Sequence, residues 1–273
     1  MTHNHADEAG DPFEPILEPR IIYDSGGIIV VAKPAGMHCA PASEPGTLCS
    51  WVFARMPQAA IVHGFRPDEG GMAHRLDSAT SGLVAFALDD TTFTAIVQAA
   101  AAGGFVKSYR ALARPSVAGL PGSRPLLAAP DGIDENLWLA SIRRGDMAAL
   151  ARMADGSRIT STFRPYGPGA ARVACAREAE PAAAPARGKS WTRAMYRTDL
   201  KSVLPQDDAL LFDVALSRGF RHQIRAHLAW IGMPLVGDPL YGDDDGMLRL
   251  RAYRMSIALG QGAAPLVVEL GAC

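Results

Sequence analysis

A carboxylate and a guanidinium stand close together in the sequence, just before an apolar run. Arg75 and Asp77 are two residues apart, and residues 83–88 that follow are all apolar. If the backbone around Asp77 is extended, side chains alternate, so these two point to one side and their neighbours to the other. The small residues 80–82 (Thr-Ser-Gly) allow a ligand or another backbone segment to approach closely. The pattern favours a site in which a cation and a nucleophilic carboxylate share a surface over a plain ion pair.

Three segments of the chain resemble the motifs of one enzyme family, in the family's order. Residues 74–82 read His-Arg-Leu-Asp-x-x-Thr-Ser-Gly, which looks like the catalytic motif of pseudouridine synthases of the RluA branch. Residues 28–37 resemble the family's first motif, a strand that ends in a Lys-Pro-x-Gly turn, and residues 222–225 with 232–242 resemble its last. On these motifs the chain is identified as a member of that family.

The resemblance assigns roles to individual residues. Asp77 would be the catalytic aspartate, and Arg75 would hold the flanking phosphate or fill the space that a flipped base leaves. Tyr109, in the position of the family's Lys-x-Tyr motif, would line the uracil pocket. In the family the arginine that matches Arg225 pairs with the catalytic aspartate, and the residue that matches Ile224 packs under the target base.

The last motif departs from the family pattern at one position. The family normally reads Gly-Arg-x-His-Gln-Ile-Arg, whereas this chain has Phe220 after Gly219 and then Arg221. Either Arg221 covers the missing arginine from the next position, or Phe220 serves as a stacking surface, and the residues leave both readings open. Arg221 and His74 complete the set of residues expected to contact RNA.

The implied reaction explains why few groups are needed. Conversion of uridine to pseudouridine breaks a bond from ribose to a ring nitrogen, turns the bound uracil and rejoins it through a ring carbon. Because no atom leaves, no cofactor is expected. The residues leave open whether Asp77 attacks the sugar, attacks the ring or takes a proton from the sugar. A free Asp has a pKa of about 3.9, burial raises it, and an adjacent Arg225 would oppose that rise.

The elements that must position these residues alternate between strands and helices. Residues 21–31 predict two short strands around a turn at 24–27, and apolar alternation predicts further strands at 106–113, 192–198 and 210–216. Helical spacing predicts helices at 47–56, 89–102 and 220–231. We therefore expect an α+β fold with a mixed, largely antiparallel sheet and flanking helices.

The domain organisation is expected to be simple. Residues 1–20 predict a flexible acidic N-terminal tail, and residues 21–273 a pseudouridine synthase catalytic domain without a separate N-terminal RNA-binding domain. Within it, residues 115–190 predict a loop-rich basic arm, because prolines, glycines and alanines dominate there. Basic residues along and just after this arm favour phosphate contact: Arg158, Arg164, Arg172, Arg177, Arg187, Lys189, Arg193, Arg197 and Lys201 against Glu178, Glu180 and Asp199.

Composition agrees with a cytoplasmic enzyme. The 273 residues are 48% hydrophobic, enough for a full core, and the formal net charge of -1 argues against a general polyanion binder. The four cysteines form no CxxC pair and predict reduced thiols without a metal site, and His3 and His5 belong to the expected tail. No apolar run predicts a membrane span or a signal peptide. We expect a cytoplasmic monomer that binds ribosomal or transfer RNA and no membrane.

Two other classes of function remain open. The first is a protein of the same fold that binds or chaperones RNA without catalysis. The departure from the family motif at Phe220 is the reason to retain this alternative. The second is an Asp-dependent glycoside or nucleoside hydrolase. That chemistry requires a second positioned acid, and no motif supplies a convincing partner for Asp77.

Overall fold

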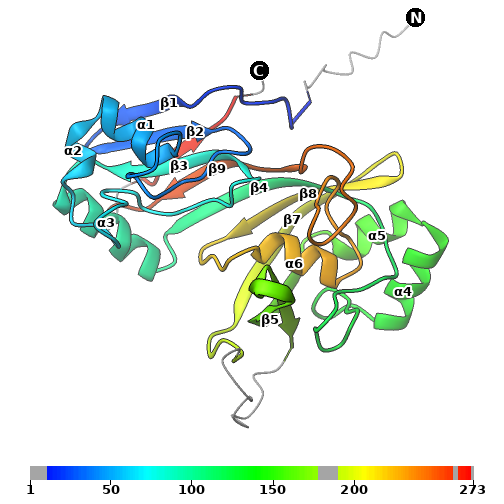
Figure 1. Cartoon of the computed structure of the whole chain (residues 1–273). Coiled ribbons are helices and arrows are strands. Elements are labelled where there is room, and N and C mark those ends of the chain that lie inside the picture. Colours follow the sequence, from blue (N-terminus) through cyan, green and yellow to red (C-terminus); the bar gives the residue numbers. More distant parts are fainter. Residues whose placement is uncertain (1–10, 178–189, 261–263, 272–273) are drawn as a thin grey trace, which may run out of the picture. The chain divides into compact units, whose positions relative to one another are not determined.

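The computed structural model describes residues 11–177, 190–260 and 264–271 of the chain. The chain divides into two compact units. The first unit is formed by residues 1–93 and 268–273, and the second by residues 94–267. Both units combine strands with helices (Figure 1).

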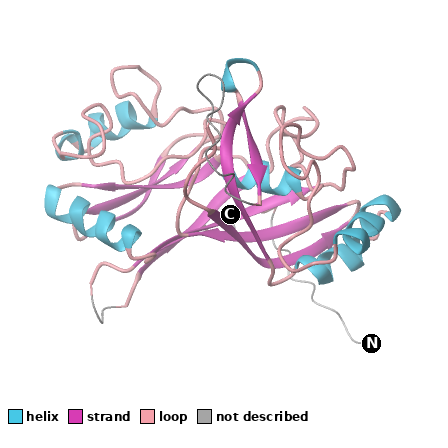
Figure 2. Cartoon of the chain, turned by 90° about the horizontal axis from the view of Figure 1, so that it is seen from below, coloured by secondary structure: helices cyan, strands magenta, loops and turns pink. Residues whose placement is uncertain are grey.

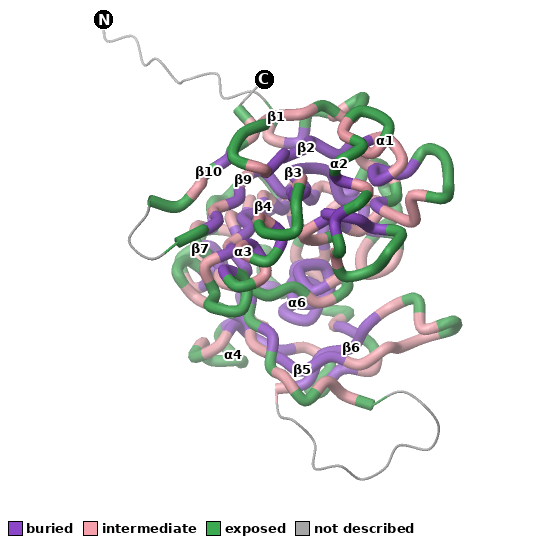
Figure 3. The backbone as a smooth tube through the Cα atoms, turned by 90° about the vertical axis from the view of Figure 1, so that its left-hand side faces the viewer, coloured by how far each residue is buried: buried purple, intermediate pink, exposed green. Residues whose placement is uncertain are grey.

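The first unit contains an antiparallel sheet that carries the first two sequence motifs. Its strands β1 (Arg20–Ser25), β2 (Ile28–Lys33) and β3 (Ser81–Ala87) are neighbours in chain order. The helices α1 (Leu48–Arg55) and α2 (Pro57–Ala60) lie in the connection between β2 and β3. Every residue of β2 and β3 is buried, as the tube in Figure 3 shows.

The register between β2 and β3 brings the two motifs together. Lys33 at the end of β2 lies opposite Gly82 at the start of β3. The Lys-Pro-x-Gly turn therefore leaves the sheet beside the segment that contains Asp77. A hydrogen bond from the Gly36 amide to the Ser78 carbonyl, 2.8 Å long, joins the turn to that segment.

The second unit is built on a larger antiparallel sheet. Its strands lie in the spatial order β9-β4-β8-β7-β5-β6, and each neighbouring pair is antiparallel. The strands are β4 (Phe105–Ala113), β5 (Arg158–Tyr166), β6 (Arg172–Ala176), β7 (Tyr196–Gln206), β8 (Ala209–Leu216) and β9 (Leu250–Ile257). Figure 2 shows η1 (Pro168–Ala170) at the tip of the hairpin formed by β5 and β6.

Helices accompany this sheet. They are α4 (Glu135–Arg144), α5 (Met147–Ala154) and α6 (Gln223–Trp230), while α3 (Asp90–Ala101) and β10 (Leu266–Glu269) each span the boundary between the units. All eight residues of α6 are buried, and the helix lies against β6 and β7.

A fully buried histidine ties α6 to the sheet. His227 Nε2 lies 2.8 Å from Ser161 Oγ of β5, and its Nδ1 lies 2.8 Å from Thr198 Oγ1 of β7. The ring stacks on Phe163 with 4.9 Å between centroids. Burial lowers the pKa of His227 to about 3, so the imidazole is neutral near pH 7 and acts as a structural hydrogen-bonding group.

Most elements expected from the sequence are present, and the α+β class with a largely antiparallel sheet is confirmed. The hairpin of β1 and β2, the helices α1 and α3, and the strands β4 and β8 fall close to their expected bounds. The strand expected at 192–198 instead begins at Tyr196 and continues to Gln206. The helix expected from Phe220 begins at Gln223, because His222 adopts a left-handed conformation with φ +57°.

The expectation of a loop-rich arm over residues 115–190 is wrong for a large part of that range, which holds α4, α5, β5 and β6. Local end signals explain the helices. Asp134 and Asp146 cap α4 and α5 by accepting hydrogen bonds from backbone amides, and Gly145 ends α4 in the left-handed conformation. Trp138 and Ile142 bury the inner face of α4. Among the arm residues, 178–189 lie outside the described ranges.

The N-terminal segment, the cysteines and the helices add further detail. Phe13 is only 4% exposed, so part of the expected N-terminal tail packs against the protein, while His3 and His5 lie outside the described residues. The described cysteines, Cys39, Cys49 and Cys175, are free and buried. In the described part of the chain, no helix combines the length and apolarity needed to cross a bilayer, and no cluster of three or more His, Cys, Asp or Glu side chains is arranged to hold a metal.

Candidate active site

The segment that contains Asp77 is irregular and leads into β3. Leu76 is 8% exposed, whereas the side chain of Arg75 is 53% exposed, so these neighbours point to opposite sides as the alternation predicts. Asp77 is half-buried, and its carbonyl accepts a 3.0 Å hydrogen bond from the Thr80 amide in the turn that precedes β3. The carboxylate is thus carried by a short segment held between a buried leucine and a buried strand.

A fully buried lysine fixes this segment to the Lys-Pro-x-Gly turn. The Nζ of Lys33 donates hydrogen bonds to the carbonyls of Pro34 and Met37, each 2.8 Å long, and to the carbonyl of Ser78 at 3.0 Å. Ser78 directly follows Asp77, so the ammonium group holds the backbone next to the candidate catalytic carboxylate. The side chain of Lys33 is 0% exposed.

The electrostatics around Lys33 follow from its burial. Desolvation lowers the pKa of Lys33 to about 8, while Cys39 and Asp77 oppose that shift by favouring the charged amine. At pH 7 the ammonium form still predominates. A buried cation therefore lies near the Asp77 carboxylate within the first unit.

Cys39 contacts the backbone of the segment at Leu76. Its Sγ lies 3.3 Å from the Leu76 carbonyl and 3.4 Å from the Leu76 amide. Burial raises the pKa of the Cys39 thiol, so it remains protonated at neutral pH and is a poor nucleophile. Its position is that of a packing and hydrogen-bonding group.

Arg75 is held by a buried glutamate. Arg75 Nη1 lies 3.0 Å from Glu69 Oε1, and the Glu69 side chain is only 5% exposed. Arg66 Nε approaches the same oxygen at 4.0 Å. Glu69 therefore fixes one end of an arginine whose other atoms remain partly open to solvent, two residues from Asp77.

His74 faces the sheet. Its Nε2 accepts a 3.2 Å hydrogen bond from the Ala85 amide of β3, and the Ala73 amide donates to the Ala85 carbonyl. Since that contact requires a lone pair on Nε2, His74 supports the segment as a neutral ring.

The remaining candidate residues belong to the second unit. Tyr109 lies on β4, opposite Val214 of β8 and Ala252 of β9, and is 5% exposed. Lys107, two residues earlier, is also buried, and burial lowers its pKa to about 8. These two residues share one face of β4, as the alternation predicts.

Arg225 forms a buried bidentate ion pair with Asp238. Arg225 Nε and Nη2 donate to the two Asp238 carboxylate oxygens at 2.9 and 2.7 Å, and the two side chains are 4% and 0% exposed. Asp238 Oδ1 also accepts from the amides of Leu240 and Tyr241. Ile224, next to Arg225 on α6, is 5% exposed. The ion pair anchors α6 to the Gly-Asp-Pro-Leu-Tyr-Gly loop.

The two residues of the altered motif have structural partners. Arg221 is exposed, and its Nη2 donates to the carbonyls of Ala170 and Arg172 at the tip of the hairpin formed by β5 and β6. Phe220 stacks on Phe163 with parallel rings whose centroids are 4.9 Å apart. Phe220 therefore packs within the second unit, and Arg221 holds the turn of the hairpin.

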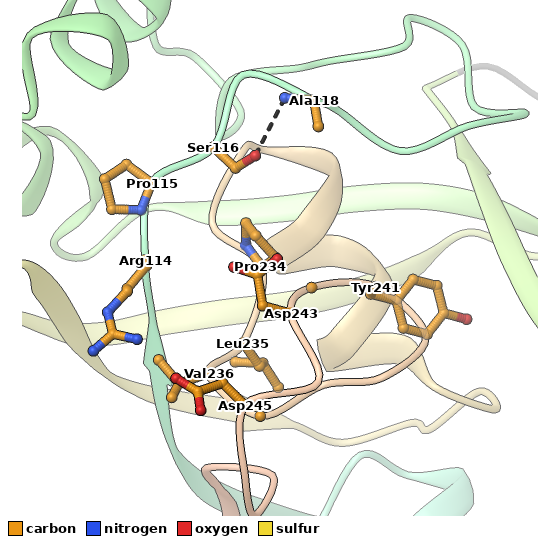
Figure 4. Close-up of a pocket in the computed structure, with 12 residues that line it drawn as sticks. Arg114, Pro115, Ser116, Ala118, Pro234, Leu235, Val236, Tyr241, Asp243 and Asp245 are labelled. Carbon is orange, nitrogen blue, oxygen red and sulfur yellow. Dashed lines mark hydrogen bonds between the residues drawn. The ribbon is translucent and has the colours of Figure 1, made fainter.

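A small pocket lies beside the Gly-Asp-Pro-Leu-Tyr-Gly loop (Figure 4). Its volume is ≈ 150 Å³, and its lining comes from the residues after β4 and from residues 234–245. Tyr241 is the lining residue that connects it to the ion pair, because the Arg225 guanidinium lies 5.3 Å from the Tyr241 ring. None of the residues expected from the sequence to contact uridine lines this pocket.

The structure thus groups the candidate residues within each unit. His74, Arg75 and Asp77 share one segment, and Ile224 and Arg225 share one helix. Sequence reasoning gave no role to Glu69, Lys33 or Asp238, although Lys33 and Asp238 stand inside the quoted motifs. Lys33 lies in an otherwise apolar strand and Asp238 in a glycine-flanked loop. These two contexts could have indicated a role for each residue, because buried charges require partners.

Comparison with known proteins identifies what the chain resembles. A family model described as RNA pseudouridylate synthase matches residues 27–230. An uncharacterized RNA pseudouridine synthase of Chloroflexus aurantiacus is 32% identical over 220 residues, which cover 80% of this chain and 53% of that protein. The ribosomal large subunit pseudouridine synthase D of Pseudomonas aeruginosa is 28% identical over 228 residues, covering 83% and 54% respectively. The chain spans about half the length of these curated relatives.

A solved structure supports the fold. Human RNA pseudouridylate synthase domain containing 1 matches with a TM-score of 0.56 at 20% identity, and the match covers 93% of this chain and 83% of that chain. At this level of identity the likeness concerns the architecture alone.

Proposed function

Because the chain belongs to the RNA pseudouridylate synthase family, and within it to the RluA branch, we propose that it isomerises specific uridines of a structured RNA to pseudouridine with Asp77 as the catalytic carboxylate. The observation that carries this proposal is the Asp77 segment itself. It keeps the family's His-Arg-Leu-Asp motif, and Lys33 fixes its backbone through the Ser78 carbonyl.

The reaction needs a carboxylate and a shaped pocket. The bond from the ribose carbon to the uracil nitrogen breaks, the uracil turns, and the ribose carbon joins a ring carbon. That ring carbon loses a proton and the freed nitrogen gains one, so atoms balance without a cofactor. Asp77 acts in this proposal as nucleophile or base, and the buried Lys33 cation lies near it.

The other candidate residues would bind the flipped nucleotide. Arg75, partly exposed and held by Glu69, would contact the phosphate or occupy the vacated base position. Tyr109 and Ile224 would contact the uracil ring, and the pairing of Arg225 with the catalytic aspartate, which the family implies, stays a prediction.

We assign supporting roles to two further residues. His74, bound to the Ala85 amide, would support the RNA-contacting surface from behind. Arg221 would act on RNA through the hairpin turn that it holds, rather than on the target uridine directly.

The substrate class is proposed from the relatives and from charge. One relative is named for the ribosomal large subunit, so ribosomal RNA is the first substrate to test, with transfer RNA as the second. Recognition would depend on RNA shape and unpaired bases, and would weaken as salt rises. The proposal keeps the expectation of a cytoplasmic monomer.

The test is a pseudouridine map of ribosomal and transfer RNA from a host that lacks the gene, complemented with the wild-type chain, Asp77→Asn or nothing. Loss of one or a few pseudouridines that only the wild type restores would support the proposal and name the substrate. Restoration by Asp77→Asn would support the rival function, an RNA-binding member of the fold without catalysis. Free uracil released from RNA would support hydrolysis.

A further inference from the structure

An arginine on the hairpin formed by β5 and β6 contacts two aromatic rings. The Arg164 guanidinium carbon is 5.0 Å from the centroid of the Trp191 ring and 5.6 Å from that of the Tyr166 ring. All three side chains are half-buried, so each keeps part of its surface open to solvent. We refer to Trp191, Arg164 and Tyr166 as the stacking row.

The backbone holds the stacking row in place. Arg164 and Tyr166 are two residues apart in β5 and therefore share one face of the strand. The Thr192 amide donates to the Phe163 carbonyl at 2.7 Å, and the Phe163 amide donates to Thr192 Oγ1 at 3.0 Å, which fixes Trp191 beside the strand.

A glycine supports the row from the preceding loop. Arg164 Nη2 donates to the Gly122 carbonyl at 3.0 Å. A Cβ at Gly122 would lie 2.4 Å from the Tyr166 ring, and φ at Gly122 is +83°, so only glycine fits there.

The opposite face of β5 supplies the core of this region. Phe163 is 0% exposed and stacks on Phe220 and His227, each with 4.9 Å between ring centroids. The stacking row is thus on the face of β5 that points away from α6.

The segments around the row are rich in arginine, although Arg177 pairs with Asp131 and Glu135, and Arg197 with Asp199. Residues 158–177 and 190–201 contain seven arginines and lysines against one acidic residue, Asp199, in a chain whose formal net charge is -1. Arg172 lies opposite Tyr166 in the register of β5 and β6. Within the described part of the chain, neither Arg172 nor Arg193 forms an ion pair with a carboxylate.

We propose that the stacking row binds an unpaired nucleobase of the RNA substrate, while Arg172 and Arg193 contact the flanking phosphates. Aromatic and guanidinium planes bind bases of any sequence, and single-stranded RNA segments are recognised in this way. The inference rests on the proposed function, which supplies RNA as the substrate. It adds a binding site on the second unit, whereas Asp77 belongs to the first.

The test measures binding of the whole chain to two short single-stranded probes by fluorescence anisotropy. One probe is fluorescein-labelled oligoadenosine, and the other is the same ribose-phosphate backbone without bases. The variants are Trp191→Leu, Trp191→Phe and the matched control Trp51→Leu. Trp51 on α1 also has an arginine over its ring, because Arg55 lies 4.0 Å from the centroid.

Trp191→Leu should weaken binding of oligoadenosine by about 5- to 150-fold, the change that corresponds to the loss of one base stack. Binding of the probe without bases should be the same as in the wild type, because phosphate contacts are retained. Trp191→Phe should keep most of the affinity, and Trp51→Leu should match the wild type. Thermal unfolding of each variant verifies that it is folded.

Three results would overturn the inference: equal affinity of wild type and Trp191→Leu for oligoadenosine, an equal loss on both probes, or a loss in Trp51→Leu as large as that in Trp191→Leu. If Trp191→Leu fails to fold, Tyr166→Leu takes its place, with the same results expected on the two probes. The anisotropy assay measures RNA binding and not catalysis. A wild-type chain that makes no pseudouridine would therefore refute the proposed function but leave the binding comparison unaffected.

Discussion

Replacement of Lys33 by methionine tests how the catalytic segment is held. Methionine keeps the length of the side chain and removes the Nζ, which leaves the carbonyls of Pro34, Met37 and Ser78 without that donor. The loss of three hydrogen bonds from a charged amine costs about 1.5–3 kcal/mol each, although the Ser78 carbonyl still accepts from the Gly36 amide. Methionine avoids the cost of desolvating a charged lysine, which is about 3 kcal/mol at neutral pH from a pKa lowered to about 8. The net loss of stability should be about 3 kcal/mol.

Lys107→Met is the matched control for this change. Lys107 is also buried, with its pKa lowered to about 8 by desolvation, but its ammonium forms no hydrogen bond with any of the described residues and lies 4.5 Å from the Phe105 ring centroid. Its replacement should therefore leave stability unchanged or raise it. Urea denaturation, read by tryptophan fluorescence, measures both variants. The reasoning is refuted if Lys33→Met is as stable as the wild type, or if Lys107→Met loses as much.

Three further predictions concern buried titratable groups and their partners. Arg75→Ala should lower the free energy of unfolding by about 2 kcal/mol, because the buried Glu69 carboxylate then keeps only the more distant Arg66, at 4.0 Å, as a cationic partner among the described residues. In a double-mutant cycle, adding Glu69→Gln should recover most of this loss. Additive losses of stability in the two single variants would contradict this. Asp238→Asn should cost about 3–5 kcal/mol in urea denaturation, since it breaks a buried bidentate pair with Arg225, and a change below about 1 kcal/mol would show that the pair is dispensable. The pKa of His227 is about 3 in the folded state and about 6.5 in the unfolded state, so the unfolded state binds more protons below pH 6.5. The free energy of unfolding should therefore fall as pH drops below about 6.5, by about 2 kcal/mol at pH 5. His227→Asn should flatten this part of the profile of stability against pH, and an unchanged acid slope would exclude His227 as its source.

The sequence predicted those parts of the molecule in which local chemistry and periodicity agree. The apolar β-branched run of β2, the Thr47 cap of α1 and the Gly232 that follows α6 are signals of this kind. The hairpin of β5 and β6 was missed because its turn, Gly167 to Ala170, lies in a proline- and glycine-rich stretch that resembles a loop. Strand pairing depends on residues that are distant in the chain, and composition does not carry that information.

The same limit applies to the candidate site. The types and spacing of Arg75 and Asp77 indicated chemistry, and the resemblance to the family's last motif named Arg225. Glu69 was missed, since it has no motif and acts only through its 3.0 Å contact with Arg75. Asp238 stands within a quoted motif, but its role as partner of Arg225 became visible only in the fold. Partner residues of buried charges are set by tertiary structure.

The most direct test of the central claim is pseudouridine formation by the purified chain on transcripts of large-subunit ribosomal RNA and transfer RNA, measured by mass spectrometry of digested nucleosides. Wild type and Asp77→Asn are compared under single-turnover conditions, with RNA binding measured in parallel. The account predicts pseudouridine with the wild type, none with Asp77→Asn, and similar RNA affinity for both. Pseudouridine formed at the wild-type rate by Asp77→Asn would contradict it.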